Sequence, residues 1–192
     1  FTDALISPPA FAPDGRRVAV SIFQGGGSDI WIYDLSTLIL SRLTSFRGVA
    51  SNPTWTPDGR RVAFIDRGSG RAVWWIAADG SGSEERLVAL TQAVRSVTFS
   101  PDGKYAVINS GSSTPESANV ADLLLLPLAG DRKPTTFVHT MFSELNPAIS
   151  FDGKWIAYQS NSTGRYEINV RPFPGLGGAI QLSAGTGGAT DP

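Results

Sequence analysis

The sequence predicts an all-β protein built from repeated four-stranded antiparallel sheets. The first observation is a repeated turn motif, Pro-Asp-Gly three times and Phe-Asp-Gly once, with the aspartates at positions 14, 58, 102 and 152. The second is the composition: 21 glycines and 13 prolines among 192 residues, with 41% hydrophobic residues, indicate many turns between short buried strands. The third is that no segment shows the apolar period of a helix.

The first two strands of each repeat flank the Asp-Gly turn. Proline fixes φ near about −65°, and glycine accepts a positive φ, so Pro-Asp-Gly makes a tight hairpin turn. In the second repeat the predicted first strand is Pro53–Thr56 and the second is Val62–Ile65. Val62–Ile65 is apolar on both faces, which is typical of a sheet packed between two neighbours.

The third strand of each repeat is strongly apolar, and the fourth is shorter and more polar, as suits an exposed sheet edge. The predicted third strands are Ile30–Tyr33, Val73–Ile76, Leu123–Leu126 and Ile168–Val170. The predicted fourth strands are Arg42–Thr44, Arg86–Val88, Thr136–Val138 and Ile180–Leu182. Large aromatic side chains dominate burial between sheets. We therefore interpret the five tryptophans as core residues between neighbouring sheets: Trp31, Trp55, Trp74, Trp75 and Trp155.

Four-stranded units that repeat every 44 to 50 residues predict a β-propeller. The whole chain, 1–192, is interpreted as one propeller region with blades at about 1–46, 47–92, 93–141 and 142–186. Residues 187–192 are similar to the start of a further blade. Either four blades close a small ring or the chain is a segment of a larger propeller, and the extra residues at the end favour the segment.

Charge and composition argue against several classes of function. The net charge of −1 lacks the basic surplus that DNA or RNA binding needs. The absence of cysteine excludes disulfides, thiol catalysis and cysteine-ligated metals. No apolar run approaches the roughly 18 residues of a membrane helix, so no direct membrane insertion is expected. The chain opens on Phe1 without the features of a signal peptide, which indicates an excised piece or a mature product.

No catalytic residue, metal ligand or cofactor site is predicted. The turn aspartates lie on separate hairpins, one per blade, where a turn role explains each of them. His139 is the only histidine and is expected in a loop after a fourth strand. A Ser-His-Asp hydrolase of the common type would also need a Gly-x-Ser-x-Gly segment, and the sequence has none.

The polar residues at the start of each first strand form the candidate binding site. In a propeller these positions line the mouth of the central channel, where loops on a rigid scaffold create pockets. Their mixture of donors and acceptors of both signs indicates a polar peptide-like or small ligand, and the alternative is a solvated channel without one. The candidate residues are Ser51, Asn52, Arg95, Ser96, Glu144, Asn146 and Asp191.

The repeat resembles the PD-type, WD-like repeat of TolB-like β-propellers. The resemblance rests on residues 12–16, 56–60, 100–104 and 150–154 and covers essentially the whole chain. It implies a bacterial protein of the periplasm or the extracellular space that serves as a scaffold for other proteins. The stretch from Val170 to Gly188 is similar to propellers that are fused to bacterial Ser/Thr protein kinases or to DNA-binding transcriptional regulators.

Three hypotheses about function follow. The first is a non-catalytic module that binds a protein, a peptide or a small ligand, as the sensor or scaffold part of a larger bacterial protein. The second is the substrate-gating propeller of a prolyl-oligopeptidase-type serine peptidase whose catalytic domain is absent from this sequence. The third is a homo-oligomer that forms through open blade faces. The repeats cover the whole chain and leave no catalytic motif, which favours the first hypothesis.

Overall fold

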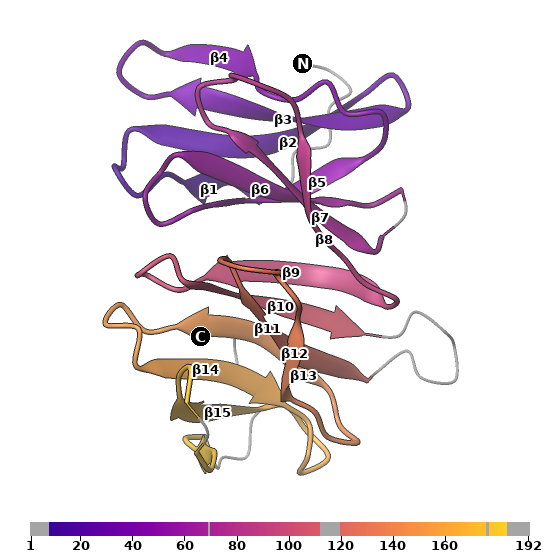
Figure 1. Cartoon of the computed structure of the whole chain (residues 1–192), viewed down its shortest axis with the longest axis vertical. Coiled ribbons are helices and arrows are strands. Elements are labelled where there is room, and N and C mark those ends of the chain that lie inside the picture. Colours follow the sequence, from indigo (N-terminus) through magenta and orange to yellow (C-terminus); the bar gives the residue numbers. More distant parts are fainter. Residues whose placement is uncertain (1–7, 69, 112–119, 176, 184–192) are drawn as a thin grey trace. The chain divides into compact units, whose positions relative to one another are not determined.

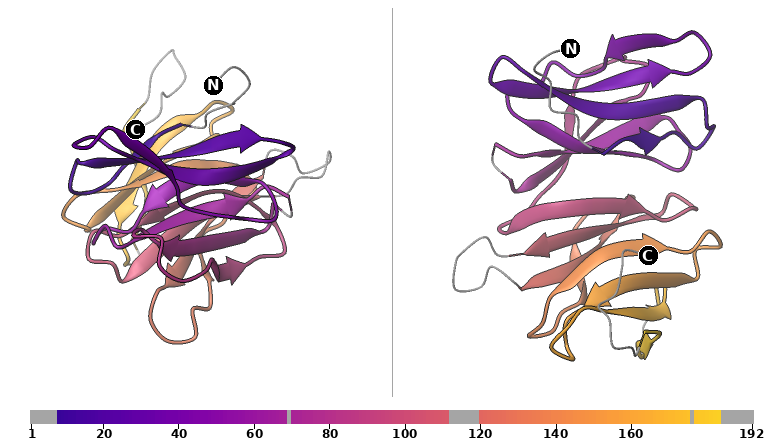
Figure 2. Two further views of the ribbon diagram at one scale, coloured as in Figure 1. Left: turned by 90° about the horizontal axis from the view of Figure 1, so that it is seen from above. Right: turned by 180° about the vertical axis from the view of Figure 1, so that it is seen from behind.

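A computed structural model describes residues 8–68, 70–111, 120–175 and 177–183 of the chain (Figure 1). These residues form four four-stranded antiparallel sheets, which confirms the predicted all-β class. The strands of each sheet are hydrogen-bonded in chain order. Figure 2 shows the same sheets from above and from behind. Among the described residues there is no helix long and apolar enough to cross a membrane.

Each sheet corresponds to one predicted repeat. The first sheet contains β1 (Ala10–Phe11), β2 (Arg17–Gln24), β3 (Gly27–Asp34) and β4 (Ile39–Arg42), and the second contains β5 (Ala50–Trp55), β6 (Arg61–Asp66), β7 (Ala72–Ala77) and β8 (Glu85–Ala89). The third contains β9 (Ala93–Phe99), β10 (Tyr105–Gly111), β11 (Ala121–Pro127) and β12 (Thr135–Val138), and the fourth contains β13 (Glu144–Ile149), β14 (Trp155–Ser160), β15 (Glu167–Pro172) and β16 (Ile180–Gln181). The predicted start of a further blade, 187–192, lies outside the described residues.

The fourth strand of the first sheet begins earlier than the sequence predicted. It covers Ile39–Arg42, whereas the prediction was Arg42–Thr44. The amides of Leu43 and Thr44 both donate to the carbonyl of Ile30, at 2.8 and 3.2 Å. Two donors on one acceptor interrupt the regular ladder, so the strand ends before these residues.

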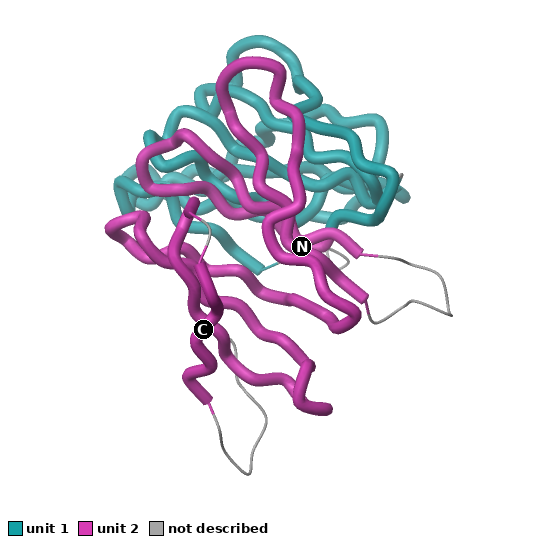
Figure 3. Tube along the Cα trace, turned by 60° about the horizontal axis from the view of Figure 1, so that its bottom comes forward, with its two compact units in different colours: residues 1–94 teal, residues 95–192 magenta. Residues whose placement is uncertain are grey.

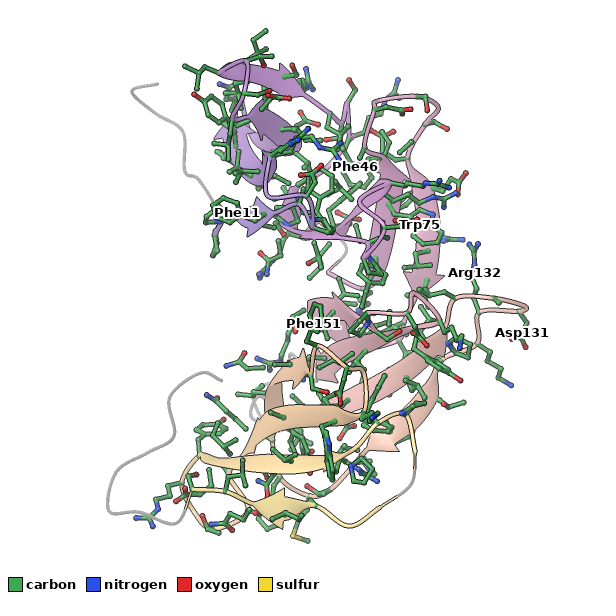
Figure 4. All side chains as sticks on the ribbon, turned by 90° about the vertical axis from the view of Figure 1, so that its left-hand side faces the viewer. Phe11, Phe46, Trp75, Asp131, Arg132 and Phe151 are labelled. Atoms are coloured by element: carbon green, nitrogen blue, oxygen red, sulfur yellow. The ribbon has the colours of Figure 1, made fainter. Side chains whose placement is uncertain are left out.

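The Asp-Gly turns have the predicted chemistry. In the third repeat the Ser100 hydroxyl donates to Asp102 Oδ1 at 2.6 Å, and the Lys104 amide donates to the same oxygen at 3.0 Å. Gly103 has a φ of +68°. The fourth repeat has Phe151 in place of proline, yet its equivalent hydroxyl bond is also 2.6 Å, and Phe151 is 99% exposed (Figure 4). A hydroxyl group donates to each carboxylate and thereby lowers the pKa of Asp58, Asp102 and Asp152.

The chain divides into two compact units, residues 1–94 and 95–192 (Figure 3). In the first unit an apolar core joins the two sheets, with Ile30 and Ile32 from the first sheet and Val62, Phe64 and Ile76 from the second among its members. The ring of Phe46 packs edge-on against Phe64, with 5.2 Å between the ring centroids (Figure 4). The first sheet therefore buries one face against the second.

The second unit repeats this stacking. Its core contains Val107 and Leu123 from the third sheet and Ile156 and Tyr158 from the fourth. A hydrogen bond also links the paired sheets in each unit at equivalent positions, and its acceptor is the first residue of β5 or β13. The bonds are Ser21 Oγ to the Ala50 carbonyl and Asn109 Nδ2 to the Glu144 carbonyl, both at 2.6 Å.

The tryptophan prediction is confirmed for Trp55, which belongs to the core between the first two sheets, and wrong for Trp155. Trp55 and Trp75 are both 6% exposed. Trp155 is 43% exposed. Its neighbour Ile156 faces the third sheet, and successive side chains of a strand point to opposite faces. Trp155 therefore lies on the face of the fourth sheet that is turned away from the third. Trp31 and Trp74 are half-buried.

Candidate functional site

Six of the seven candidate residues lie on the first strands of the described sheets, which are edge strands in each sheet. Ser51 and Asn52 are neighbours on β5 in the first unit. The second unit contains Arg95 and Ser96 on β9 and Glu144 and Asn146 on β13, and Asp191 lies outside the described residues. A channel mouth that joins all of them stays a prediction.

A strained backbone distinguishes two of these positions. Asn52 has a φ of +52°, and Asn146 has a φ of +51°. In both strands the pairing register shifts here, between Ser51 and Thr54 and between Leu145 and Ala148. Such an irregularity bends a strand and redirects a side chain, and asparagine tolerates the left-handed region better than most residues.

The residue after each of these asparagines is a proline, which cannot donate to the ladder and is found at such irregularities. Both asparagines were predicted as site residues for their polarity, and their left-handed backbone was not predicted. A signal was available, because Asn-Pro recurs at the same distance before the Asp-Gly turn in the second and fourth repeats.

The candidate residues differ in how accessible they are. Arg95 and Asn146 are exposed, and Asn52 and Ser96 are half-buried. Asn146 Nδ2 donates to Gln159 Oε1 at 3.3 Å. These four side chains can offer amide, guanidinium and hydroxyl groups to a ligand.

Ser51 and Glu144 are buried and bond within their own units. Ser51 is 8% exposed, and its hydroxyl donates to the Ile65 carbonyl at 3.3 Å while it accepts from Arg67 Nε at 3.2 Å. Glu144 is 1% exposed, and its Oε1 accepts from the Thr140 hydroxyl at 2.7 Å. Burial raises the pKa of Glu144. Ser51 and Glu144 therefore stabilise the starts of β5 and β13 through hydrogen bonds to neighbouring residues.

His139 belongs to a structural pair that recurs in other sheets. In the first sheet the Thr44 hydroxyl donates to Asp29 Oδ1 at 2.8 Å, which ties the end of β4 to the start of β3. In the third sheet His139 Nδ1 lies 2.9 Å from Asp122 Oδ1 at the equivalent place. In the fourth sheet Ser183 and Glu167 make the same link. The predicted loop position of His139 after a fourth strand is confirmed.

The first unit also contains a groove that the sequence analysis did not identify. Its volume is about 340 Å³, and its lining includes Ile32, Asp34 and Arg42. The guanidinium group of Arg42 is already paired with Asp29 at 2.5 Å. The Ser36 hydroxyl donates to Asp34 and lowers the pKa of that carboxyl to about 2. The charged groups of the groove are thus engaged locally, which does not favour a charged ligand.

Comparison with known proteins identifies the family of the chain. The TolB beta propeller domain model matches residues 2–171. The chain belongs to the TolB beta propeller domain family. Comparison with curated proteins gives no match. The four-stranded antiparallel sheets of this TolB-type chain agree with the propeller class that the repeats predicted.

Several solved structures share this fold. TolB from Acinetobacter baumannii has a TM-score of 0.76 and 21% identity, with 94% of this chain and 44% of that chain covered. A TolB from Agrobacterium tumefaciens has a TM-score of 0.76 and 19% identity, with 96% and 64% covered. Oligogalacturonate lyase from Vibrio parahaemolyticus has a TM-score of 0.73 and 10% identity, with 94% and 53% covered. The TolB-family chain thus spans less than two thirds of each structure, and the likeness at these identities is one of fold.

Proposed function

We propose that this TolB-family chain is a non-catalytic binding module that recognises a protein or a peptide through the starts of the first strands of its sheets. The observation that carries the proposal is the pair of irregular Asn-Pro positions in β5 and β13. In each, an asparagine with a left-handed backbone interrupts the regular pleat of the strand, and its side chain is half-buried at Asn52 and exposed at Asn146. A backbone irregularity at equivalent places in two repeats favours a role in presenting these side chains.

The chemistry of the accessible residues suits a polar peptide. An asparagine side chain can donate to a peptide carbonyl and accept from a peptide amide at the same time. Arg95 adds an exposed guanidinium group that can bind a carboxylate. Side chains of this kind on a rigid sheet are typical of recognition sites.

We place the module in the periplasm or outside the cell, as the sensor or scaffold part of a larger bacterial protein. The support is the TolB family and the structural likeness to two bacterial TolB proteins. The partner is proposed to be a protein or a peptide rather than a nucleic acid, because the net charge is −1.

An array of short synthetic peptides of random sequence tests the proposal. Wild-type protein should bind a subset of the peptides. Asn52→Gly and Asn146→Gly remove the side chain but permit the same positive φ, so each should weaken that binding by about two- to tenfold, the effect of one lost hydrogen bond. The matched control is Lys104→Ala, which changes an exposed residue beside an Asp-Gly turn and should bind as the wild type does. The proposal is wrong if no peptide binds the wild type, or if the two glycine variants and the control bind equally well.

A further inference from the structure

An acid–imidazole cluster lies where the third sheet meets the fourth, within the second unit. It consists of Asp122 at the start of β11, His139 after β12 and Glu144 at the start of β13. His139 Nδ1 is 2.9 Å from Asp122 Oδ1. The Thr140 hydroxyl donates to Glu144 Oε1 at 2.7 Å, and Ser160 Oγ lies 3.4 Å from the same oxygen. The cluster therefore connects the end of one sheet to the first strand of the next.

The other repeats show what this cluster replaces. The link between the third and fourth strands uses the hydroxyl of Thr44 in the first sheet and that of Ser183 in the fourth. A hydroxyl group keeps the same charge over the physiological range of pH, whereas an imidazole loses its proton between about pH 5 and 8. In β5 the residue equivalent to Glu144 is Ala50, since both carbonyls accept the bond between the sheets. The junction of the third and fourth repeats thus places two titratable groups, His139 and Glu144, at positions where the equivalent residues Thr44, Ser183 and Ala50 are uncharged.

The burial of Glu144 makes its charge costly. The residue is 1% exposed, and its Oε2 has no hydrogen-bond partner among the described residues. Burial is the main cause of its raised pKa, the Thr140 hydroxyl opposes the rise, and the carboxylate of Asp122 adds to it. A charged His139 would lower the pKa of Glu144. The pKa of Glu144 therefore depends on the charge of His139, the residue that also contacts Asp122.

The other strands around Glu144 bring few charges. β10 contributes the uncharged Asn109, and β14 contributes Tyr158, whose pKa is raised by burial. Glu167 is paired with Ser160 on the next strand, and Arg165 Nε neutralises it at 2.6 Å. The end of β10 also lies near Arg95, whose Nε would be 3.0 Å from a Cβ atom at Gly111. His139 and Asp122 remain the groups that act directly on Glu144.

We propose that Asp122, His139 and Glu144 form a pH-sensitive link that holds the end of β12 and the start of β13 more tightly in mildly acidic than in alkaline solution. The link would regulate the order of the strand that carries Asn146, but it does not depend on whether that strand binds a peptide.

Both titrations act in the same direction. At 2.9 Å an imidazolium form of His139 would make a charge-assisted hydrogen bond to the Asp122 carboxylate, whereas a neutral imidazole would keep only an uncharged one. The pKa of Glu144 is higher in the folded than in the unfolded chain, so the contribution of this side chain to the stability of the fold is fully present below the unfolded pKa. That contribution is lost as the pH rises through the folded pKa. An increase in pH therefore weakens the link in both ways.

Hydrogen exchange of the complete chain, followed by mass spectrometry at about pH 5.5 and about pH 8, tests the proposal across the range in which imidazole titrates. After correction for the intrinsic effect of pH on exchange, segment 137–149 should lose about two- to fivefold in protection at the higher pH, as expected for one ion pair with an exposed partner. Segment 43–55 contains the Thr44 link and Ala50, so it is the internal control and should not change.

Two variants separate a pH-dependent role from a merely structural one. His139→Thr installs the residue of the first sheet, and Glu144→Gln removes the buried charge at nearly constant size. In each variant the protection of segment 137–149 should differ less between the two pH values than it does in the wild type. If one variant fails to fold, the other still tests the proposal. Equal pH responses of the two segments in the wild type, or an unchanged response of segment 137–149 in both variants, would overturn the proposal.

Discussion

Replacement of Trp55 tests whether the first two sheets are held together by the side chains between them. Trp55 is 6% exposed, and its Nε1 donates to the Ala10 carbonyl at 2.9 Å. The guanidinium carbon of Arg17 lies 4.7 Å from the centre of the Trp55 ring. Trp55→Ala removes the buried ring, the hydrogen bond between the sheets and the contact of the ring with the Arg17 guanidinium group.

The structure allows the costs to be ranked. Trp55→Ala should lower the free energy of unfolding by about 3–5 kcal/mol, as for other buried large aromatic residues. Trp55→Phe keeps a ring and removes the indole donor, and because Ala10 is only half-buried, water can replace that donor at a cost of about 1 kcal/mol. Trp155→Ala is the matched control, and because Trp155 is 43% exposed it should cost about 1–2 kcal/mol.

Urea unfolding monitored by hydrogen exchange measures these effects in each unit separately. Segments from 8–68 report on the first unit, and segments from 120–175 report on the second. Trp55→Ala should shift the unfolding of the first unit to lower urea, and Trp155→Ala should affect the second unit less strongly. If Trp155→Ala cost as much as Trp55→Ala, burial between the sheets would not be the source of their stability.

Three further predictions follow from single positions. Asn52→Ala should destabilise the chain by about 1–2 kcal/mol in urea unfolding, because alanine does not tolerate a φ of +52°, whereas Asn52→Gly should stay near the wild type. The pKa of Asp34 falls from 3.8 to about 2, mainly through the Ser36 hydroxyl, so its stabilising effect is present above pH 3.8 and is lost as the pH falls through about 2. Asp34→Ala should therefore flatten the loss of stability over that range in an acid titration followed by circular dichroism, and an unchanged slope would contradict this assignment. Thr44→Val should cost about 1–3 kcal/mol in urea unfolding, because it leaves the buried Ile30 amide without its hydroxyl acceptor and removes one of the donors to Asp29, which keeps Arg42 and the Phe46 amide. Thr44→Ser keeps the hydroxyl and should cost less.

The turns and strands could be predicted because they depend on residues that are close in sequence. Each Asp-Gly turn is closed by its own aspartate and by a hydroxyl two residues earlier in three of the four repeats, so the motif contains the information it needs. The apolar third strands are equally local, and all four lie where the sequence placed them. The misplaced fourth strand of the first sheet ends where the Leu43 and Thr44 amides both donate to the Ile30 carbonyl, so its end depends on the pairing with another strand.

The burial of the candidate site residues could not be predicted in the same way. Ser51 and Glu144 are polar and occupy the expected strand starts, yet both are buried. Their burial depends on the sheet that precedes them in the same unit. The links between third and fourth strands were also missed, because their second member is a threonine, a histidine or a serine and has no common sequence signal.

The repeat supplies its own reference for separating structural features from specific ones. Features that recur with the same geometry, such as the Asp-Gly turns and the bonds to the carbonyls of Ala50 and Glu144, hold the sheets together and say little about function. Departures from the common pattern are more informative, because the fold does not require them. His139 in place of a hydroxyl is one such departure, and Glu144 at the position of Ala50 is another. A variant that restores the common residue at such a place should keep the fold and lose only the specific property, which makes these positions the ones to change first.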